Sequence, residues 1–226
     1  STQVSAFGTD QVSVLGTVQV GALSTLGVKA LSTGQVSALT SAQVSVLSTD
    51  QVSVLGTAQV GAIETVDVQA LSTGQVAVLT SAQVSALTSG QLVMLSSGQV
   101  VALNTTALRG LTSDQVMALT SVQVGGLTTT QVSALSTVQV GAIETVDVQV
   151  LSTLQVVALN TALIRALTVE QVSALTSAQV RSLTSVQVGA LSTAQVGAIE
   201  TVDVQALTSV QVAVLTSAQV SVLGTD

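Results

Sequence analysis

The stretch LTSAQVSALTSGQL, Leu79–Leu92, contains a pattern that recurs through the whole chain. Counted from Ser1, the 226 residues form 28 blocks of eight without insertion or deletion, followed by Thr225 and Asp226. We call each block an octad and number its positions one to eight. Position three is Gln in 22 octads, position four is Val in 25, position seven is Leu in 24, and position eight is Ser or Thr in 19. Such a repeat predicts one structural unit per octad.

A longer period lies on top of the octad. Residues 97–152 and 153–208 align at an offset of seven octads, and the run TVDVQ recurs at Thr65, Thr145 and Thr201, at spacings of ten and seven octads. These two spacings share no common factor. The octad is therefore the structural unit, and the longer period indicates no coil with a fixed whole number of octads per turn.

Position eight carries the signals of a helix start. It holds Ser, Thr, Asn or Gly in 25 octads, which are the residues preferred at a helix N-cap. With the N-cap there, Gln at position three falls at N3 and completes a capping box, in which its side chain reaches back to the N-cap amide. Leu at position seven and Val at position four of the next octad then form a hydrophobic staple. These three coinciding signals predict one short capped helix per octad.

The distribution of charge supports the same register. All eleven acidic residues lie at positions two, three or eight, and all four basic residues lie at position five. Acids on the first turn and bases beyond it are what the helix dipole favours. The alternative is an all-β solenoid, supported by the many Val and Thr residues and by Gly at position five in six octads. Because positions six and seven are both apolar, strict strand alternation fails, and we expect an all-α repetitive solenoid.

The octads must share one core. In a single long helix, an eight-residue repeat would rotate the apolar stripe by about 80° per octad and bury nothing. A helix of about six residues is also far below the ~12–15 needed for isolated stability. We therefore expect residues 1–226 to be one tandem array whose neighbouring turns pack on each other, and we expect this array to be part of a longer one. Small residues at positions five and six would permit close packing of adjacent turns.

Composition excludes several classes of function. The chain has no Cys, His, Trp, Tyr or Pro, charged residues make up 7%, and the net charge is −7. Nucleic-acid binding needs a basic face, and no apolar run approaches the ~18 residues that span a membrane. No His is present to activate the abundant Ser and Thr hydroxyls. We expect no enzyme activity, no catalytic residue, no cofactor, no nucleic-acid partner and no membrane insertion.

Three acidic pairs recur in the identical context GAIETVD: Glu64 with Asp67, Glu144 with Asp147, and Glu200 with Asp203. Carboxylate oxygens are ligands for Ca²⁺, so each pair is a weak calcium candidate. Two carboxylates are too few unless neighbouring turns contribute. The competing interpretation, which we favour, places Glu at the N-cap and Asp at N3, where negative charge stabilises a helix.

Two octads, TTALRGLT (105–112) and TALIRALT (161–168), lose the Gln and carry an Arg, each after an Asn. Arg109 and Arg165 are either partner contacts or, as we favour, solvated side chains at a variable surface position. Positions eight and one also form a regular array of hydroxyl groups. Such a face suggests binding of ice or of a carbohydrate, although the capping role already occupies the position-eight hydroxyl.

The pattern Leu-Thr-x-x-Gln-Val-x-x-Leu, as in the stretch from Leu79, resembles the short repeats of very large secreted or surface-displayed bacterial proteins of the adhesin-like or RTX-like kind. The chain lacks the Gly-Gly-x-Gly-x-Asp nonapeptide of RTX repeats, so calcium-driven folding does not carry over. The resemblance implies an extracellular or cell-surface spacer or adhesive role, without a catalytic residue. We therefore expect a stiff rod, stalk or filament that associates with itself or with neighbouring repeats, with a cell-surface or matrix partner as a further expectation. The alternative is a module that binds ice, glycan or protein.

Overall fold

The computed structural model describes residues 4–223, which form short helices and no strand. A 3-10 helix, η1, is followed by 27 α-helices of four to six residues, one in each octad. The expected all-α repetitive solenoid is therefore confirmed, and the all-β alternative is wrong. Val and Thr favour strands, but the capping pair in each octad outweighs that preference. It supplies partners for the backbone N–H groups that a helix start leaves unpaired. No helix of the described chain is long and apolar enough to cross a membrane.

The chain divides into two compact units, Ser1–Leu119 and Thr120–Asp226, and we describe each by itself. The elements of unit 1 are η1 (Val4–Ala6), α1 (Thr9–Ser13), α2 (Thr17–Gly21), α3 (Thr25–Lys29), α4 (Thr33–Ser37), α5 (Ser41–Ser45), α6 (Thr49–Ser53), α7 (Thr57–Gly61), α8 (Thr65–Val68), α9 (Thr73–Ala77), α10 (Ser81–Ser85), α11 (Ser89–Met94), α12 (Ser97–Ala102), α13 (Thr105–Leu108) and α14 (Ser113–Met117). The elements of unit 2 are α15 (Ser121–Gly126), α16 (Thr129–Ala134), α17 (Thr137–Gly141), α18 (Thr145–Val150), α19 (Thr153–Ala158), α20 (Thr161–Ala166), α21 (Val169–Ser173), α22 (Ser177–Ser182), α23 (Ser185–Ala190), α24 (Thr193–Gly197), α25 (Thr201–Val204), α26 (Ser209–Ala213) and α27 (Ser217–Val220).

Helix α10 shows why each octad forms a helix. Its N-cap, Thr80, has extended backbone angles, and its hydroxyl oxygen accepts a hydrogen bond from the Gln83 amide at 3.2 Å. In return, the Thr80 amide donates to Gln83 Oε1 at 2.8 Å. This is the predicted capping box, and it satisfies two donors that would otherwise lack partners at the helix start. The predicted N-cap at position eight is therefore confirmed in this octad.

The core is built from positions four and seven. Val84, at position four, is fully buried, and Leu87, at position seven, is 4% exposed. The same two positions are buried in octad after octad of both units, while position two is exposed throughout the described chain. Burying a Val or Leu side chain contributes about 1.5–3 kcal/mol, so the repeated pair of apolar side chains provides the main stabilisation of each turn.

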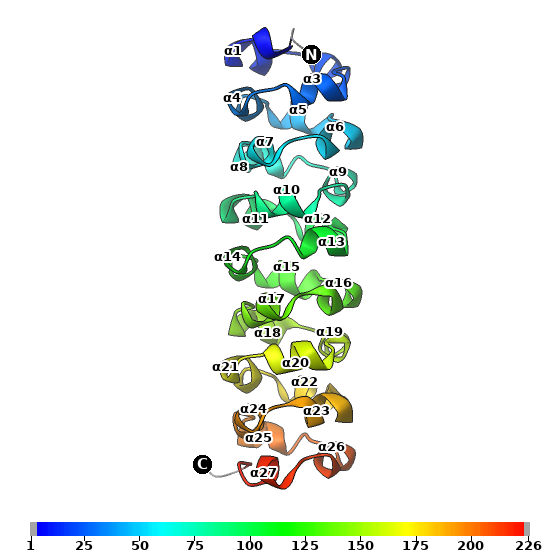
Figure 1. Ribbon diagram of the computed structural model, residues 1–226, viewed down its shortest axis with the longest axis vertical. Coiled ribbons are helices and arrows are strands. Elements are labelled where there is room, and N and C mark those ends of the chain that lie inside the picture. Colours follow the sequence, from blue (N-terminus) through cyan, green and yellow to red (C-terminus); the bar gives the residue numbers. More distant parts are fainter. Residues whose placement is uncertain (1–3, 224–226) are drawn as a thin grey trace. The chain divides into compact units, whose positions relative to one another are not determined.

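Within each unit the helices wind into a coil whose turns stack on one another (Figure 1). In unit 1, helix α5 packs against α2 and α8, which lie three octads before and after it. In unit 2, helix α20 packs in the same way against α17 and α23. Each helix therefore depends on its neighbours in the turns on either side, as expected for a solenoid.

One turn of the coil takes more than three octads and fewer than four. Helices pack at a spacing of three octads, yet the side chain of Gln43 reaches back four octads to the carbonyl oxygens of Val12 and Leu15. The turn therefore falls between these two values, in agreement with the absence of a whole-number period in the sequence.

Small residues at positions five and six allow the turns to approach, as predicted. A Cβ atom at Gly61, position five, would lie 2.9 Å from the Ala86 carbonyl oxygen of the next turn. At Gly110, position six, it would lie 2.2 Å from the Ser81 carbonyl oxygen. Both separations are shorter than a normal contact, so only glycine fits these two places without a backbone shift.

Candidate functional site

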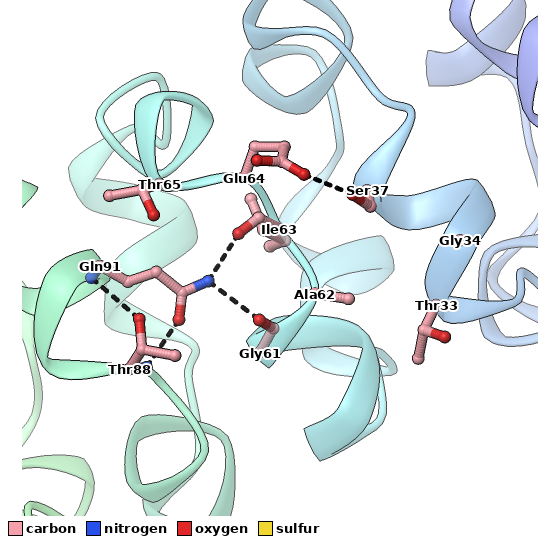
Figure 2. A pocket seen from close by; sticks show the side chains of 10 residues that line it. All are labelled: Thr33, Gly34, Ser37, Gly61, Ala62, Ile63, Glu64, Thr65, Thr88 and Gln91. Atoms are coloured by element: carbon pink, nitrogen blue, oxygen red, sulfur yellow. Dashed lines mark hydrogen bonds between the residues drawn. The ribbon is translucent and has the colours of Figure 1, made fainter.

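The feature that joins one turn to the next is the Gln side chain at position three. Figure 2 shows this side chain at Gln91. Its Oε1 atom accepts from the backbone amide of Thr88 at 2.7 Å, and the backbone amide of Gln91 donates to Thr88 Oγ1 at 3.1 Å. The Nε2 atom of the same side chain donates to the Ile63 carbonyl oxygen at 2.6 Å and to the Val60 carbonyl oxygen at 3.2 Å. We call these bonds to the octad four places earlier a glutamine link. One side chain thus caps its own helix and holds the preceding turn.

The chemistry of the link requires an amide. The Gln91 side chain is 1% exposed, and a buried polar group is tolerated only when it is hydrogen-bonded. Its oxygen serves as the acceptor for the helix start, and its NH₂ group serves as the donor for the carbonyl oxygens of the earlier turn. A Glu side chain would complete the capping box equally well but would offer no donor to those carbonyl oxygens.

Glutamine links recur in both units with similar lengths. Where the Nε2 bond to the position-seven carbonyl oxygen is found, it measures 2.6–2.9 Å. In unit 1 the links start from Gln35, Gln43, Gln51, Gln59, Gln75, Gln83, Gln91, Gln99 and Gln115. In unit 2 they start from Gln155, Gln171, Gln179, Gln187, Gln195, Gln211 and Gln219.

Octads 105–112 and 161–168, which carry Arg and lack Gln, replace the link with apolar side chains. Ala107 and Leu163 occupy position three and are buried, and the larger Leu108 and Ile164 replace Val at position four with no exposed surface. Asn104, the residue directly before octad 105–112, caps helix α13. Its Nδ2 atom also donates to the Ala77 carbonyl oxygen of the preceding turn at 3.1 Å. In octad 105–112 a core side chain and a second donor thus stand where the Gln is missing.

Arg165 is more than a solvated side chain. Although it is exposed, its Nε atom donates to the Ala190 carbonyl oxygen in the following turn at 3.2 Å. Position five of one octad lies against position six of the octad three places later, which is also where Gly61 meets Ala86. The favoured interpretation of this arginine as merely solvated is therefore incomplete. A contact with a partner protein stays a prediction.

The acidic pairs take the places that the sequence analysis favoured. Glu64 is the N-cap of α8 and Asp67 is its N3 residue. Glu144 and Asp147 take the same places in α18, as do Glu200 and Asp203 in α25. None of the three Glu side chains makes a capping hydrogen bond.

Glu64 and the Asp of each pair accept hydrogen bonds from serines of the preceding turn. Ser37 donates to Glu64 Oε1 at 2.5 Å, as Figure 2 shows. Asp67 accepts from the Ser41 hydroxyl. Asp147 accepts from Ser121 Oγ at 2.6 Å. In the part of the chain that is described, no group of three or more His, Cys, Asp or Glu side chains is arranged to hold a metal ion. Calcium binding at the pairs stays a prediction.

Shallow grooves run between adjacent turns near these acids. In unit 1 a groove of about 430 Å³ is lined by Ser37, Glu64, Thr65 and Thr88, among others. Figure 2 shows Glu64 and Thr65 on one side of it and Thr33 and Ser37 on another. Hydroxyl and carboxylate groups share the lining of this groove with the apolar Ala62 and Ile63.

A similar groove in unit 2 contains a titrating group with a perturbed environment. The groove measures about 510 Å³ and is lined by Thr145, Gln149, Glu170 and Glu200, among others. A backbone hydrogen bond at Glu170 and the Thr168 hydroxyl hold the pKa of the Glu170 carboxyl below its ordinary value. Hydrogen bonds to the charged form have this effect because they stabilise the carboxylate. The groove is thus negatively charged near neutral pH.

The repeat defines the family of the chain. The model of the ALTTAQ repeat matches seven times, at residues 21–49, 28–62, 60–97, 93–129, 140–177, 173–198 and 196–226. These matches cover most of the chain, so it belongs to the ALTTAQ repeat family. Among curated proteins none matches this chain. The repeat array expected from the sequence is thereby confirmed, and its expected adhesin-like or RTX-like context stays a prediction.

The glutamine link itself was not predicted. The capping box explains the acceptor at position three, but it accepts Glu and Gln equally. Position three holds Gln in 22 octads and Glu in none. That exclusive choice of the amide is the signal in the sequence that a second, donor function exists there.

Proposed function

We propose that this chain is a structural segment of an extracellular, surface-displayed protein, and that its octads act as a stiff, non-catalytic spacer. The observation that supports the proposal most is the glutamine link. It ties each turn to the preceding one by buried hydrogen bonds, in unit 1 at Gln43 and in unit 2 at Gln179. Buried bonds repeated at every turn oppose bending and stretching, because a change of angle between turns breaks several of them together.

The spacer role is tested by scattering from arrays of different length. Small-angle X-ray scattering would compare the full array with truncated arrays of about 14 and about 21 octads. We expect the largest dimension to rise in proportion to the number of octads. A matched array in which Gln75 and Gln83 are replaced by Glu should be shorter or more flexible. A largest dimension that does not increase with the number of octads would refute the spacer.

Display outside the cell is tested separately. The support for it is the resemblance of the octad to repeats of large secreted and surface proteins. An antibody against the array should label intact cells of the source organism as strongly as permeabilised cells. Labelling that requires permeabilisation would refute surface display and would leave the spacer role untouched.

Self-association into a filament is the next part of the proposal. Position two places apolar side chains on the surface: Val18 is 84%, Val122 72% and Leu154 71% exposed. Exposed apolar side chains favour contact between arrays. Sedimentation velocity should show larger species as concentration rises, and replacing Val122 and Leu154 by Asp should reduce them. A chain that stays monomeric at high concentration would refute the filament.

A surface-binding module is the second candidate. The position-eight hydroxyl is engaged in capping, whereas the position-one hydroxyls of Thr33 and Thr65 lie at the surface and line a groove with Glu64. A repeated hydroxyl face of this kind favours a glycan or ice surface. Replacing Thr33 and Thr65 by Val should weaken binding to a glycan array or inhibition of ice growth and leave the fold intact. A spacer would tolerate the same changes.

A further inference from the structure

Three octads carry Asp in place of the Gln that makes the glutamine link. Two of them, Asp67 in unit 1 and Asp203 in unit 2, face an octad of their own unit, which lies four octads earlier: octad 33–40 for Asp67 and octad 169–176 for Asp203. In a Gln octad, Nε2 donates to carbonyl oxygens 31 and 28 residues earlier, as Gln43 does to Val12 and Leu15. The corresponding acceptors for Asp67 are the carbonyl oxygens of Val36 and Leu39. An ionised carboxylate has no proton to donate to them.

Of the two carbonyl groups facing each Asp, the one at position seven lacks a donor, whereas Val36 and Val172 still accept from the amides of Leu39 and Leu175. Among residues 4–223, no hydrogen bond to the carbonyl oxygen of Leu39 or of Leu175 is found. Leu39 and Leu175 are themselves buried, at 4% and 3% exposed. In linked turns, the equivalent Leu47 carbonyl oxygen accepts from Gln75 Nε2 at 2.7 Å.

The Asp side chains are themselves poorly compensated. Asp67 and Asp203 are 6% and 4% exposed, and the hydrogen-bond donors found for their carboxylates are the single hydroxyls of Ser41 and Ser177. Burying a carboxylate is unfavourable unless several donors or a countercharge surround it. The octads with Ala107 and Leu163 avoid this penalty because they fill the same place with apolar side chains.

The helices of these two octads are also among the shortest. Helices α8 and α25 have four residues, whereas the neighbouring α7, α9, α24 and α26 have five. Each ends in a tighter turn, in which Ala70 donates to the Asp67 carbonyl oxygen and Ala206 to the Asp203 carbonyl oxygen. Fewer helical hydrogen bonds lower the free energy needed to open the octad.

From these three observations we infer that the coil opens first at the octad of Asp67 in unit 1 and at the octad of Asp203 in unit 2. In unit 1 the opening lies between octads 33–40 and 65–72, and in unit 2 between octads 169–176 and 201–208. The Asp octads are thus built-in yielding points in a coil whose other turns are held by glutamine links or by apolar packing. This inference concerns the coil alone and does not depend on where the protein is displayed or what it binds.

Native-state hydrogen exchange with mass spectrometry on the full 226-residue chain tests the inference in unit 1. Peptides from octads 33–40 and 65–72 should exchange about tenfold faster than those from octads 41–48 and 73–80, which Gln75 links. The substitution Asp67→Gln restores the donor and should slow the exchange of the first pair to the rate of the second. Asp67→Asn removes the charge, but the Asn side chain is shorter than that of Gln and should give an intermediate rate.

The matched control is Asp50→Gln, the same chemical change at an exposed position two. It should leave the exchange of octads 33–40 and 65–72 unchanged. Equal exchange of the two pairs of octads in the unmodified chain would overturn the inference, and so would an Asp67→Gln protein that folds but exchanges as fast as before. If Asp67→Gln does not fold, the comparison within the unmodified chain still decides the question.

Discussion

Octads 73–80 and 161–168 fill the same place in the coil in opposite ways. In the first, Gln75 is 2% exposed and its side chain bonds to the Ser72 amide at 2.6 Å and to the Val44 and Leu47 carbonyl oxygens at 2.9 and 2.7 Å. In the second, Leu163 takes that place at 3% exposed. One octad joins the turns with a fully bonded amide, and the other joins them with apolar contact.

The difference shows what the position between turns tolerates. The place is filled either by an amide whose polar atoms are all hydrogen-bonded or by an apolar side chain. Octad 161–168 follows the second course: Asn160 Oδ1 accepts from the amides of Ala162 and Leu163, and Arg165 donates to the Ala190 carbonyl oxygen. A polar group that is only partly hydrogen-bonded at this place should lower the free energy of unfolding relative to either arrangement. Substitutions that create such a group therefore test the comparison.

Gln75→Glu should have the largest effect. The substitution keeps the acceptor for Ser72 but places a carboxylate against the Val44 and Leu47 carbonyl oxygens. We expect a loss of about 3–5 kcal/mol, because an uncompensated charge is then buried. Urea unfolding followed by circular dichroism measures it. Asp50→Glu, at an exposed position, is the control, and a loss below about 1 kcal/mol in Gln75→Glu would contradict the role of the Nε2 donor.

Leu163→Ala should have the next largest effect. It removes the side chain that fills the unlinked place and leaves a cavity beside the fully buried Ile164. Leu-to-Ala changes in cores lower stability by about 2–5 kcal/mol, and we expect a value in the lower half of that range. The same unfolding experiment gives the number. The exposed Leu154, replaced by Ala as the control, should change stability by less than about 0.5 kcal/mol.

The sequence carries the local structure and much less of the contact between turns. The capping pair Ser72 and Gln75 lies within one octad, so its pattern predicts the helix start and the register. The partners of Gln75 Nε2 lie 31 and 28 residues earlier, and their positions depend on how many octads make a turn. That number follows from packing between turns, which the octad pattern does not encode. The pairing of Ser41 with Asp67 was missed for the same reason.

Ser72→Ala sharpens the comparison by removing only the local half of the polar solution. The Ser72 hydroxyl accepts from the backbone amide of Gln75 at 3.2 Å. The bonds from the Gln75 side chain to the preceding turn do not involve this hydroxyl. Loss of an N-cap side chain lowers stability by about 1 kcal/mol. We expect that loss without a change in the exchange of the Val44 and Leu47 octad. A loss as large as that of Gln75→Glu would mean that capping, and not the link, stabilises the coil.

The pH dependence at Glu170 is the smallest effect and separates surface charge from the buried link. Its side chain is fully exposed, and a backbone hydrogen bond and the Thr168 hydroxyl lower the pKa of its carboxyl from 4.5. A carboxyl with a lowered folded-state pKa stabilises the fold above its unfolded pKa, and this contribution is lost as pH falls through the folded value. Glu170→Gln should therefore lower Tm slightly at pH 7, and this difference should disappear as pH falls through the folded-state pKa of the carboxyl. Asp114→Asn, at the same position of another octad, provides the comparison. A Tm difference that persists unchanged in acid would show that Glu170 acts through packing instead of through its charge.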